Sequence, residues 1–178
     1  MHFTSERRLD EGIVERAFTL DGVPGILWTP PSASLSAPVP VILMGLPGGI
    51  GLDRMYPRLV ARARSVAAYG FAAVCVELPG AGERPRLPGA EQARADLVRA
   101  ISAGDRPSDD VVDRLILPLV DQAVPEWQAT LDEVLALPEI GDQVGIYGGL
   151  IAVGTCMAAT DPRVAAAGLF AGSYVPQA

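Results

Sequence analysis

The most suggestive chemistry in this sequence lies at a glycine-rich turn in residues 144–154, VGIYGGLIAVG. An apolar, strand-like run ends there in two glycines, and an apolar, helix-like run follows. A sharp turn of this kind displays one side chain at its tip, and glycine allows the tight backbone it needs. In the register that we favour, the displayed residue is Leu150, which has no reactive group. The competing register, centred within residues 145–149, would display Tyr147 instead.

The histidine content limits what such a turn could do. The sequence has one histidine, His2, in an N-terminal segment that we expect to be mobile. A Ser–His–Asp relay needs an imidazole beside its nucleophile, and zinc sites are commonly built from several histidines or cysteines. We therefore expect no such relay, no metal site and no cofactor.

Two side chains remain as candidate catalytic groups near the glycine-rich turns. Glu83 in an apolar cleft would have a raised pKa and could act as a general acid or base; the alternative is an exposed turn residue paired loosely with Arg84. Tyr147 is the second candidate, and its alternative is a core residue with a locally bonded hydroxyl. Asp53 lies close by in the sequence, although it could simply cap the helix that follows.

Composition excludes several classes of partner. The 178-residue chain carries a net charge of −7, and its basic residues are scattered, so no basic patch is available to bind nucleic acid. No apolar run reaches the roughly 18 residues of a membrane span, and residues 1–12 lack the apolar core of a signal peptide. We expect one soluble, cytoplasmic domain without a membrane partner.

Hydrophobic periodicity predicts alternating strands and helices. A hairpin is expected over residues 15–30, and buried strands over 39–49, 71–85, 142–149 and 164–173. Helices are expected over 54–70, 89–104, 111–137 and 150–160, with Pro118 and Pro125 kinking or dividing the third. This order predicts an α/β fold whose mostly parallel sheet has helices on both faces. Sites in such sheets lie beyond the carboxyl ends of the strands.

Four segments, in this order, resemble the α/β-hydrolase superfamily, in particular its dienelactone-hydrolase and esterase-like members. VILMGLPGGIG (41–51) stands where that family has its oxyanion loop, and VCVELPGAGERP (74–85) matches a strand ending in Asp-x-Pro-Gly-His-Gly. VGIYGGLIAVG matches the nucleophile elbow, and DPRVAAAGLFAGS (161–173) the strand after it. The resemblance implies a single α/β-hydrolase-like domain over 1–178, with a helical, lid-like segment at about 86–125.

The sequence departs from the family pattern at each catalytic position. Leu150 stands where the family has its serine. Leu46-Pro47 stands where a histidine precedes the glycines of the oxyanion loop, and Ala81 replaces the histidine of the Pro-Gly-His-Gly turn. The family's acid and catalytic histidine follow later strands that this sequence does not contain. The resemblance therefore implies a truncated member that lacks the Ser-His-Asp triad. Glu77, where the family has an aspartate, is expected to bond turn amides.

The same resemblance places a pocket between the three glycine-rich turns. Its walls would be apolar, and its backbone N–H groups could bind a carbonyl or enolate oxygen. The residues expected to form the pocket are Leu46, Gly48, Gly49, Ile50, Asp53, Arg84, Leu150 and Ile151.

These features favour a protein that binds a small apolar carbonyl compound and promotes a non-hydrolytic step, such as a cyclisation, isomerisation or elimination of specialised metabolism. One alternative is a non-catalytic pseudoenzyme that binds a ligand or a partner. A second is a residual esterase or lactonase that uses Tyr147, or water activated by Glu83.

The apolar strand near the C-terminus would form a sheet edge, and we expect a homodimer contact to cover it.

Overall fold

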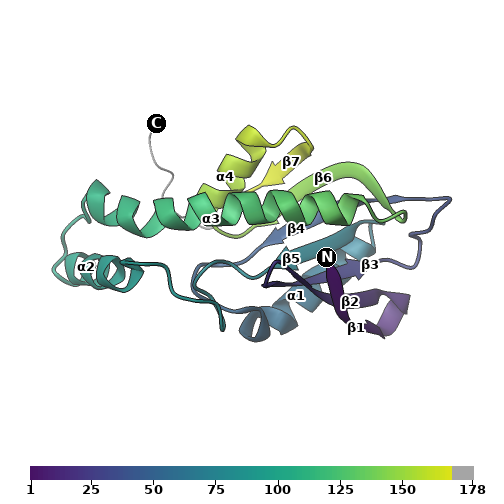
Figure 1. Ribbon diagram of the computed structural model, residues 1–178, viewed down its shortest axis with the longest axis horizontal. Helices are drawn as coiled ribbons and strands as arrows, with labels where there is room; N and C mark the ends of the chain where they lie inside the picture. Colours follow the sequence, from purple (N-terminus) through teal and green to yellow (C-terminus); the bar gives the residue numbers. More distant parts are fainter. Residues whose placement is uncertain (170–178) are drawn as a thin grey trace.

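The computed structural model describes residues 1–169, which form a seven-stranded mixed sheet with the order β1-β2-β3-β5-β4-β6-β7 (Figure 1). Five strands run in one direction, and β1 and β3 oppose them, so the expected mostly parallel sheet is confirmed. The strands are β1 (His2–Arg8), β2 (Val14–Leu20), β3 (Val23–Thr29), β4 (Val39–Gly45), β5 (Ala72–Val76), β6 (Ile140–Gly148) and β7 (Val164–Gly168). The helices are a 3-10 turn η1 (Asp10–Gly12), α1 (Leu52–Ala67), α2 (Ala90–Ser102), α3 (Asp109–Leu135) and α4 (Ile151–Thr160).

The path of the chain fixes where a site can form. The chain leaves β4 through α1 to β5 on one side, then crosses back through α2 and α3 to β6 on the other side of β4. Because such crossovers are right-handed, this reversal puts α1 on one face of the sheet and α3 and α4 on the opposite face. A crevice opens where the direction reverses, beyond the carboxyl ends of β4, β5 and β6.

The N-terminal hairpin is confirmed. β2 and β3 pair in antiparallel register through a two-residue turn at Asp21 and Gly22, both with positive φ (48° and 81°). A turn of that hand matches the twist of the two strands. β3 then pairs with β5, which joins the hairpin to the parallel part of the sheet.

The expectation that the N-terminal segment is mobile is wrong. His2–Arg8 form β1, which pairs antiparallel with β2. Phe3 packs edge-to-face on the buried Phe18 with ring centroids 6.5 Å apart, and this apolar contact holds the strand in place. His2 is exposed on this outer strand, at the edge of the sheet farthest from β7.

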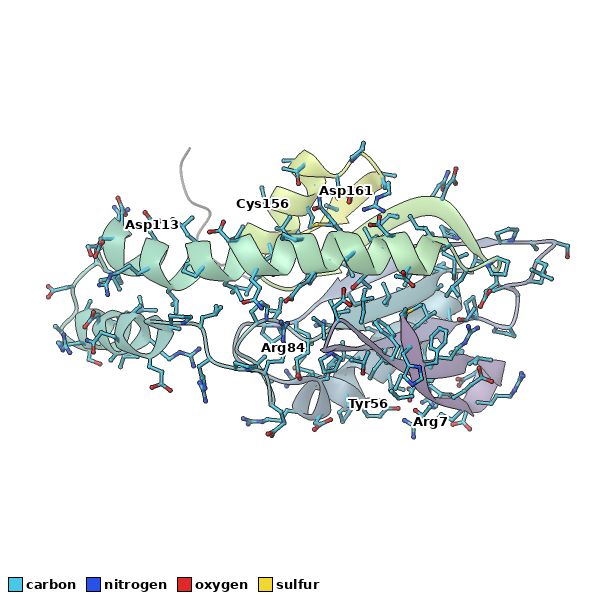
Figure 2. All side chains as sticks on the ribbon, in the orientation of Figure 1. Arg7, Tyr56, Arg84, Asp113, Cys156 and Asp161 are labelled. Atoms are coloured by element: carbon cyan, nitrogen blue, oxygen red, sulfur yellow. The ribbon has the colours of Figure 1, made fainter. Side chains whose placement is uncertain are left out.

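A buried carboxylate ties the N-terminal strands to α1. Glu15 on β2 accepts hydrogen bonds from the side chains of Arg7, Trp28 and Tyr56, each at 2.7 Å. Figure 2 shows Arg7 and Tyr56 beside each other at this corner of the molecule. Burial raises the pKa of Tyr56, and its hydrogen bond to Glu15 acts in the same direction. The bonding capacity of the buried carboxylate is thereby used within the fold.

Two outcomes were predicted for the prolines of α3, a kink or a division of the helix, and the division is wrong. Asp109–Leu135 form one helix that includes both Pro118 and Pro125. Each proline costs about 3 kcal/mol in a helix interior. The buried face of α3, which includes Trp127 and Leu131, offsets that cost, since burying one large apolar side chain contributes about 2 kcal/mol. Despite this length, no helix in residues 1–169 is long and apolar enough to cross a bilayer.

β7 is the outermost strand of the sheet on the side of β6. It pairs with β6 in parallel register, and no strand within residues 1–169 pairs with its other edge. Ala165, Ala166, Ala167 and Gly168 are all exposed. The expected continuation of this strand from 170 to 173 lies outside the described residues. An uncharged, exposed edge strand favours pairing with another chain.

The homodimer contact expected at β7 stays a prediction. We expect light scattering to give twice the 18.6 kDa mass of the chain, and an Ala166→Lys variant to shift the species toward the monomer, because a charge on an edge strand opposes association. A monomer of the unaltered chain at micromolar concentration would contradict this expectation.

Candidate functional site

The carboxyl ends of β4 and β6 approach so closely that only glycine fits between them. A Cβ added at Gly45 would lie 2.6 Å from the Cα of Gly149, and one added at Gly149 would lie 2.5 Å from the Cα of Gly45. Gly149 also has a φ of +82°, which other residues rarely adopt. These contacts force the chain to turn sharply between β6 and α4.

Leu150 stands at this turn. It is the residue immediately before α4, with an extended backbone (φ −70°, ψ 118°), and its side chain points toward the loop after β4. A Cβ added at Gly48 would lie 3.2 Å from the Leu150 Cδ1. Tyr147, by contrast, lies within β6, 39% exposed, with the Arg62 guanidinium 5.7 Å from the centre of its ring.

Glu77 fixes the loop after β4 to the turn after β5. Its carboxylate is buried and accepts a hydrogen bond of 2.8 Å from the backbone N–H of Leu52, the first residue of α1. A Cβ added at Gly51 would lie 3.0 Å from the Glu77 Oε1, and one added at Gly82 would also collide with this carboxylate. The sequence prediction that Glu77 bonds a turn amide is therefore confirmed.

Above these turns lies a cavity of about 700 Å³, which we call the elbow cavity. The strand-end turns contribute Gly48, Gly49, Pro79, Gly80 and Leu150 to its wall. Three of the residues expected to form a pocket, Gly48, Gly49 and Leu150, thus share one cavity. Within residues 1–169 the backbone N–H groups of Gly48 and Gly49 donate to no acceptor.

The helical segment covers the elbow cavity from the other side. α2 and the first half of α3 extend beyond the sheet in Figure 1 and pack against each other. Their apolar contribution to the wall is Ala90, Ala95 and Val98 from α2 and Leu115, Ile116 and Leu119 from α3, and Leu87 adds to it from the segment before α2. The lid-like role expected for residues at about 86–125 stays a prediction.

The remaining residues expected at the pocket lie elsewhere. Leu46 is fully buried in the core, and Ile50 is half-buried against it. Asp53 is exposed in the first turn of α1, and Ile151 begins α4. None of these four residues lines the elbow cavity, and neither does Tyr147.

Glu83 and Arg84 line a second, smaller cavity of about 350 Å³ between the β2–β3 turn and α3. Arg84 makes a bidentate ion pair with Glu126 of α3, with N–O distances of 2.9 and 2.5 Å, and donates to the Glu77 carbonyl oxygen at 2.6 Å. Figure 2 shows Arg84 beneath α3. Arg84 thus fastens the β5 turn to α3, and the pair with Glu83 that the sequence left open is not found.

Sequence reasoning missed the charged residues of the elbow cavity. Arg86, Arg94 and Arg99 line it together with Glu91, whereas the sequence indicated only scattered surface arginines. A signal was present, because Ala90, Arg94 and Val98 recur at the spacing of one helix face. The pattern alone did not identify the cavity arginines, because the sequence does not show which face of that helix meets the strand-end turns.

The described residues hold no conventional nucleophile in the elbow cavity, since no serine, threonine, cysteine, histidine or tyrosine lines its wall. Cys75 is fully buried in β5, and burial raises the pKa of its thiol far above the ordinary value. No group of three or more His, Cys, Asp or Glu side chains within residues 1–169 is placed to hold a metal ion. The groups that the cavity wall provides for binding are the two glycine amides and three guanidinium groups.

No family model matches the sequence, and no curated protein matches it. Solved structures do resemble the fold. A cold-adapted esterase from an Arctic intertidal metagenomic library is 22% identical with a TM-score of 0.64, over 95% of this chain and 65% of its own. An S-formylglutathione hydrolase from Agrobacterium tumefaciens is 16% identical with a TM-score of 0.58, over 95% of this chain and 61% of its own. The α/β hydrolase GrgF from Penicillium is 16% identical with a TM-score of 0.53, over 93% of this chain and 44% of its own.

These likenesses show the fold: the chain has the architecture of α/β hydrolases, as the motifs predict. The chain spans less than two-thirds of the length of each of these structures.

We predict that Glu77 is needed to hold the site together. Glu77→Ala removes the acceptor of the Leu52 N–H, and we expect it to lower the free energy of unfolding by about 2 kcal/mol. The matched control is Glu83→Ala, which removes an exposed carboxylate six residues away and should cost less than about 0.5 kcal/mol. Urea denaturation measures both values, and equal costs would contradict the role of Glu77.

We also predict that Leu150→Ser gains no esterase activity. His2, the single histidine, lies on β1, five strands from β6 and thus about 24 Å away at the usual spacing of strands. A serine at the turn would have no base to activate it. Hydrolysis of p-nitrophenyl acetate should match that of Leu150→Ala, and saturable turnover by the serine variant alone would refute the prediction.

Proposed function

We propose that this chain binds a small, mostly apolar carbonyl compound in the elbow cavity and promotes a non-hydrolytic step on it. One observation carries the proposal. An apolar cavity of about 700 Å³ opens directly over Leu150, at the point where the fold presents two backbone N–H groups and no nucleophile. A volume of this size suits a drug-sized molecule.

The amide groups of Gly48 and Gly49 determine which ligand chemistry fits. Both belong to the exposed loop after β4, and both residues line the elbow cavity. Adjacent backbone N–H groups stabilise negative charge that develops on a carbonyl oxygen, as in an enolate or an enol-like transition state. An aliphatic or aromatic body of the ligand would contact Leu115, Ile116 and Leu119 across the cavity.

The residues of the wall favour intramolecular chemistry over hydrolysis. Leu150 gives no covalent intermediate, and Glu91 is the only carboxylate among the described lining residues. Holding a ligand in a reactive conformation and polarising its carbonyl group can accelerate a cyclisation, isomerisation or elimination without a protein nucleophile.

Two other functions rank behind this one. Ligand binding without turnover uses the same cavity and differs only in the absence of a chemical step. Hydrolysis is the activity named for the esterase and the S-formylglutathione hydrolase of similar fold. For this chain it is disfavoured because Glu83 and Tyr147, the groups that could supply it, do not line the elbow cavity.

The experiment uses 4-phenylbutan-2-one as a probe and 4-phenylbutan-2-ol as its carbonyl-free counterpart. We expect the ketone to shift the amide NMR signals of Gly48 and Gly49 and to bind more tightly than the alcohol. Val98→Trp fills the elbow cavity and should weaken ketone binding at least tenfold. Ile101→Trp, which places the same ring on the same helix at a residue that does not line the cavity, should leave ketone binding unchanged.

The chemical step is tested separately with the same ketone in D₂O. Enolate stabilisation should accelerate exchange of the protons beside the carbonyl group, and Val98→Trp should abolish the acceleration. Binding without any acceleration would favour the non-catalytic function, and no binding at all would overturn the proposal.

A further inference from the structure

We propose that the ligand of the elbow cavity is an oxo acid: its keto oxygen binds the amides of Gly48 and Gly49, and its carboxylate binds Arg94. This inference rests on the proposed function and adds a negative charge to the ligand. It follows from the position of one arginine relative to the loop after β4.

Arg94 reaches across the elbow cavity from α2 to this loop. A Cβ added at Gly49 would lie 2.9 Å from the Arg94 Nη2, so the guanidinium group rests against the loop at that residue. The approach is possible because position 49 is a glycine, with a φ of +74°. Arg94 therefore places a positive charge next to Gly49, one of the two loop residues whose amide groups donate to no acceptor within residues 1–169.

Arg94 also differs from the other charged groups of the wall. Arg99 pairs with Asp96 at 3.1 Å, and Arg86 lies 4.0 Å from Glu91. No ion pair or hydrogen bond engages the Arg94 side chain within residues 1–169. Its donors are available, and a guanidinium group binds a carboxylate through two parallel hydrogen bonds.

The electrostatics of the elbow cavity contrast with those of the chain. The sequence carries a net charge of −7, yet three arginines and one glutamate line this cavity. A local excess of positive charge in an otherwise acidic protein favours an anionic ligand and would repel a cationic one. The remaining wall is mainly apolar, so the anion needs an apolar body.

The arrangement of donors selects the position of the carboxylate within the ligand. The Arg94 guanidinium group contacts the loop at Gly49, next in the chain to Gly48, whereas Leu115 and Leu119 line the elbow cavity from α3. A carboxylate bonded directly to the keto carbon, as in a 2-oxo acid, presents both oxygens on the same side of the molecule. The apolar body then extends toward the helices.

Three related molecules test the inference by titration calorimetry. They are 2-oxo-4-phenylbutanoate, 4-phenylbutan-2-one, which has a methyl group in place of the carboxylate, and 4-phenylbutanoate, which lacks the keto oxygen. We expect the oxo acid to bind about tenfold more tightly than either of the others, and the advantage to shrink at high salt because Arg94 is exposed.

Variants separate Arg94 from the general charge of the wall. Arg94→Met should weaken binding of the oxo acid about tenfold and change binding of the ketone less than about twofold, and Arg94→Lys should restore part of the loss. Arg99→Met, which removes a lining arginine that already has a partner, should have little effect on either ligand.

The outcomes distinguish this inference from the proposed function. If the ketone binds and the oxo acid binds no better, the anionic subsite is refuted while the carbonyl site stands. If Arg94→Met lowers the affinities for the oxo acid and the ketone equally, the anionic subsite is refuted as well, because an equal loss indicates that Arg94 has only a structural role. If none of the three molecules binds, the proposed function itself fails.

Discussion

The site depends on a single buried carboxylate, that of Glu77. It lies at the end of β5, accepts the first N–H group of α1 at 2.8 Å, and fills the space left by two glycines on neighbouring turns. A negative charge at a helix N-terminus is favourable, and an unpaired one in the interior is costly. The loop after β4 is thus held in one place, and the amides of Gly48 and Gly49 are held with it. Arg84 adds to this by bonding the Glu77 carbonyl oxygen and pairing with Glu126 of α3.

The turn between β6 and α4 persists for a reason that does not involve catalysis. The backbones of Gly45 and Gly149 are in direct contact, and any side chain at either position would collide with the other strand. At this close approach the chain needs glycine at both positions to pass from β6 into α4, whatever residue stands at the tip of the turn. With Leu150 there, the turn supplies an apolar floor to a cavity, and the neighbouring loop supplies hydrogen-bond donors.

Much of this fold could be predicted from the sequence because its signals are local. The apolar runs ending in glycine predicted β4, β5 and β6, and Asp21-Gly22 predicted the hairpin. The missed features depend on tertiary contacts. Phe3 forms a strand because it packs on Phe18, and α3 continues through its prolines because its buried face stabilises it. The cavity arginines were missed for the same reason, since the orientation of α2 over Gly49 is set by its packing on α3.

The most direct test of the central claim is the carbonyl signal of 4-phenylbutan-2-one labelled with ¹³C at that carbon, observed by NMR in the presence of the protein. The account predicts a downfield shift on binding relative to the free ketone, because two amide donors polarise the carbonyl group in a mainly apolar cavity. A bound ketone with an upfield shift, as in a purely apolar environment, would contradict it, and so would the absence of binding.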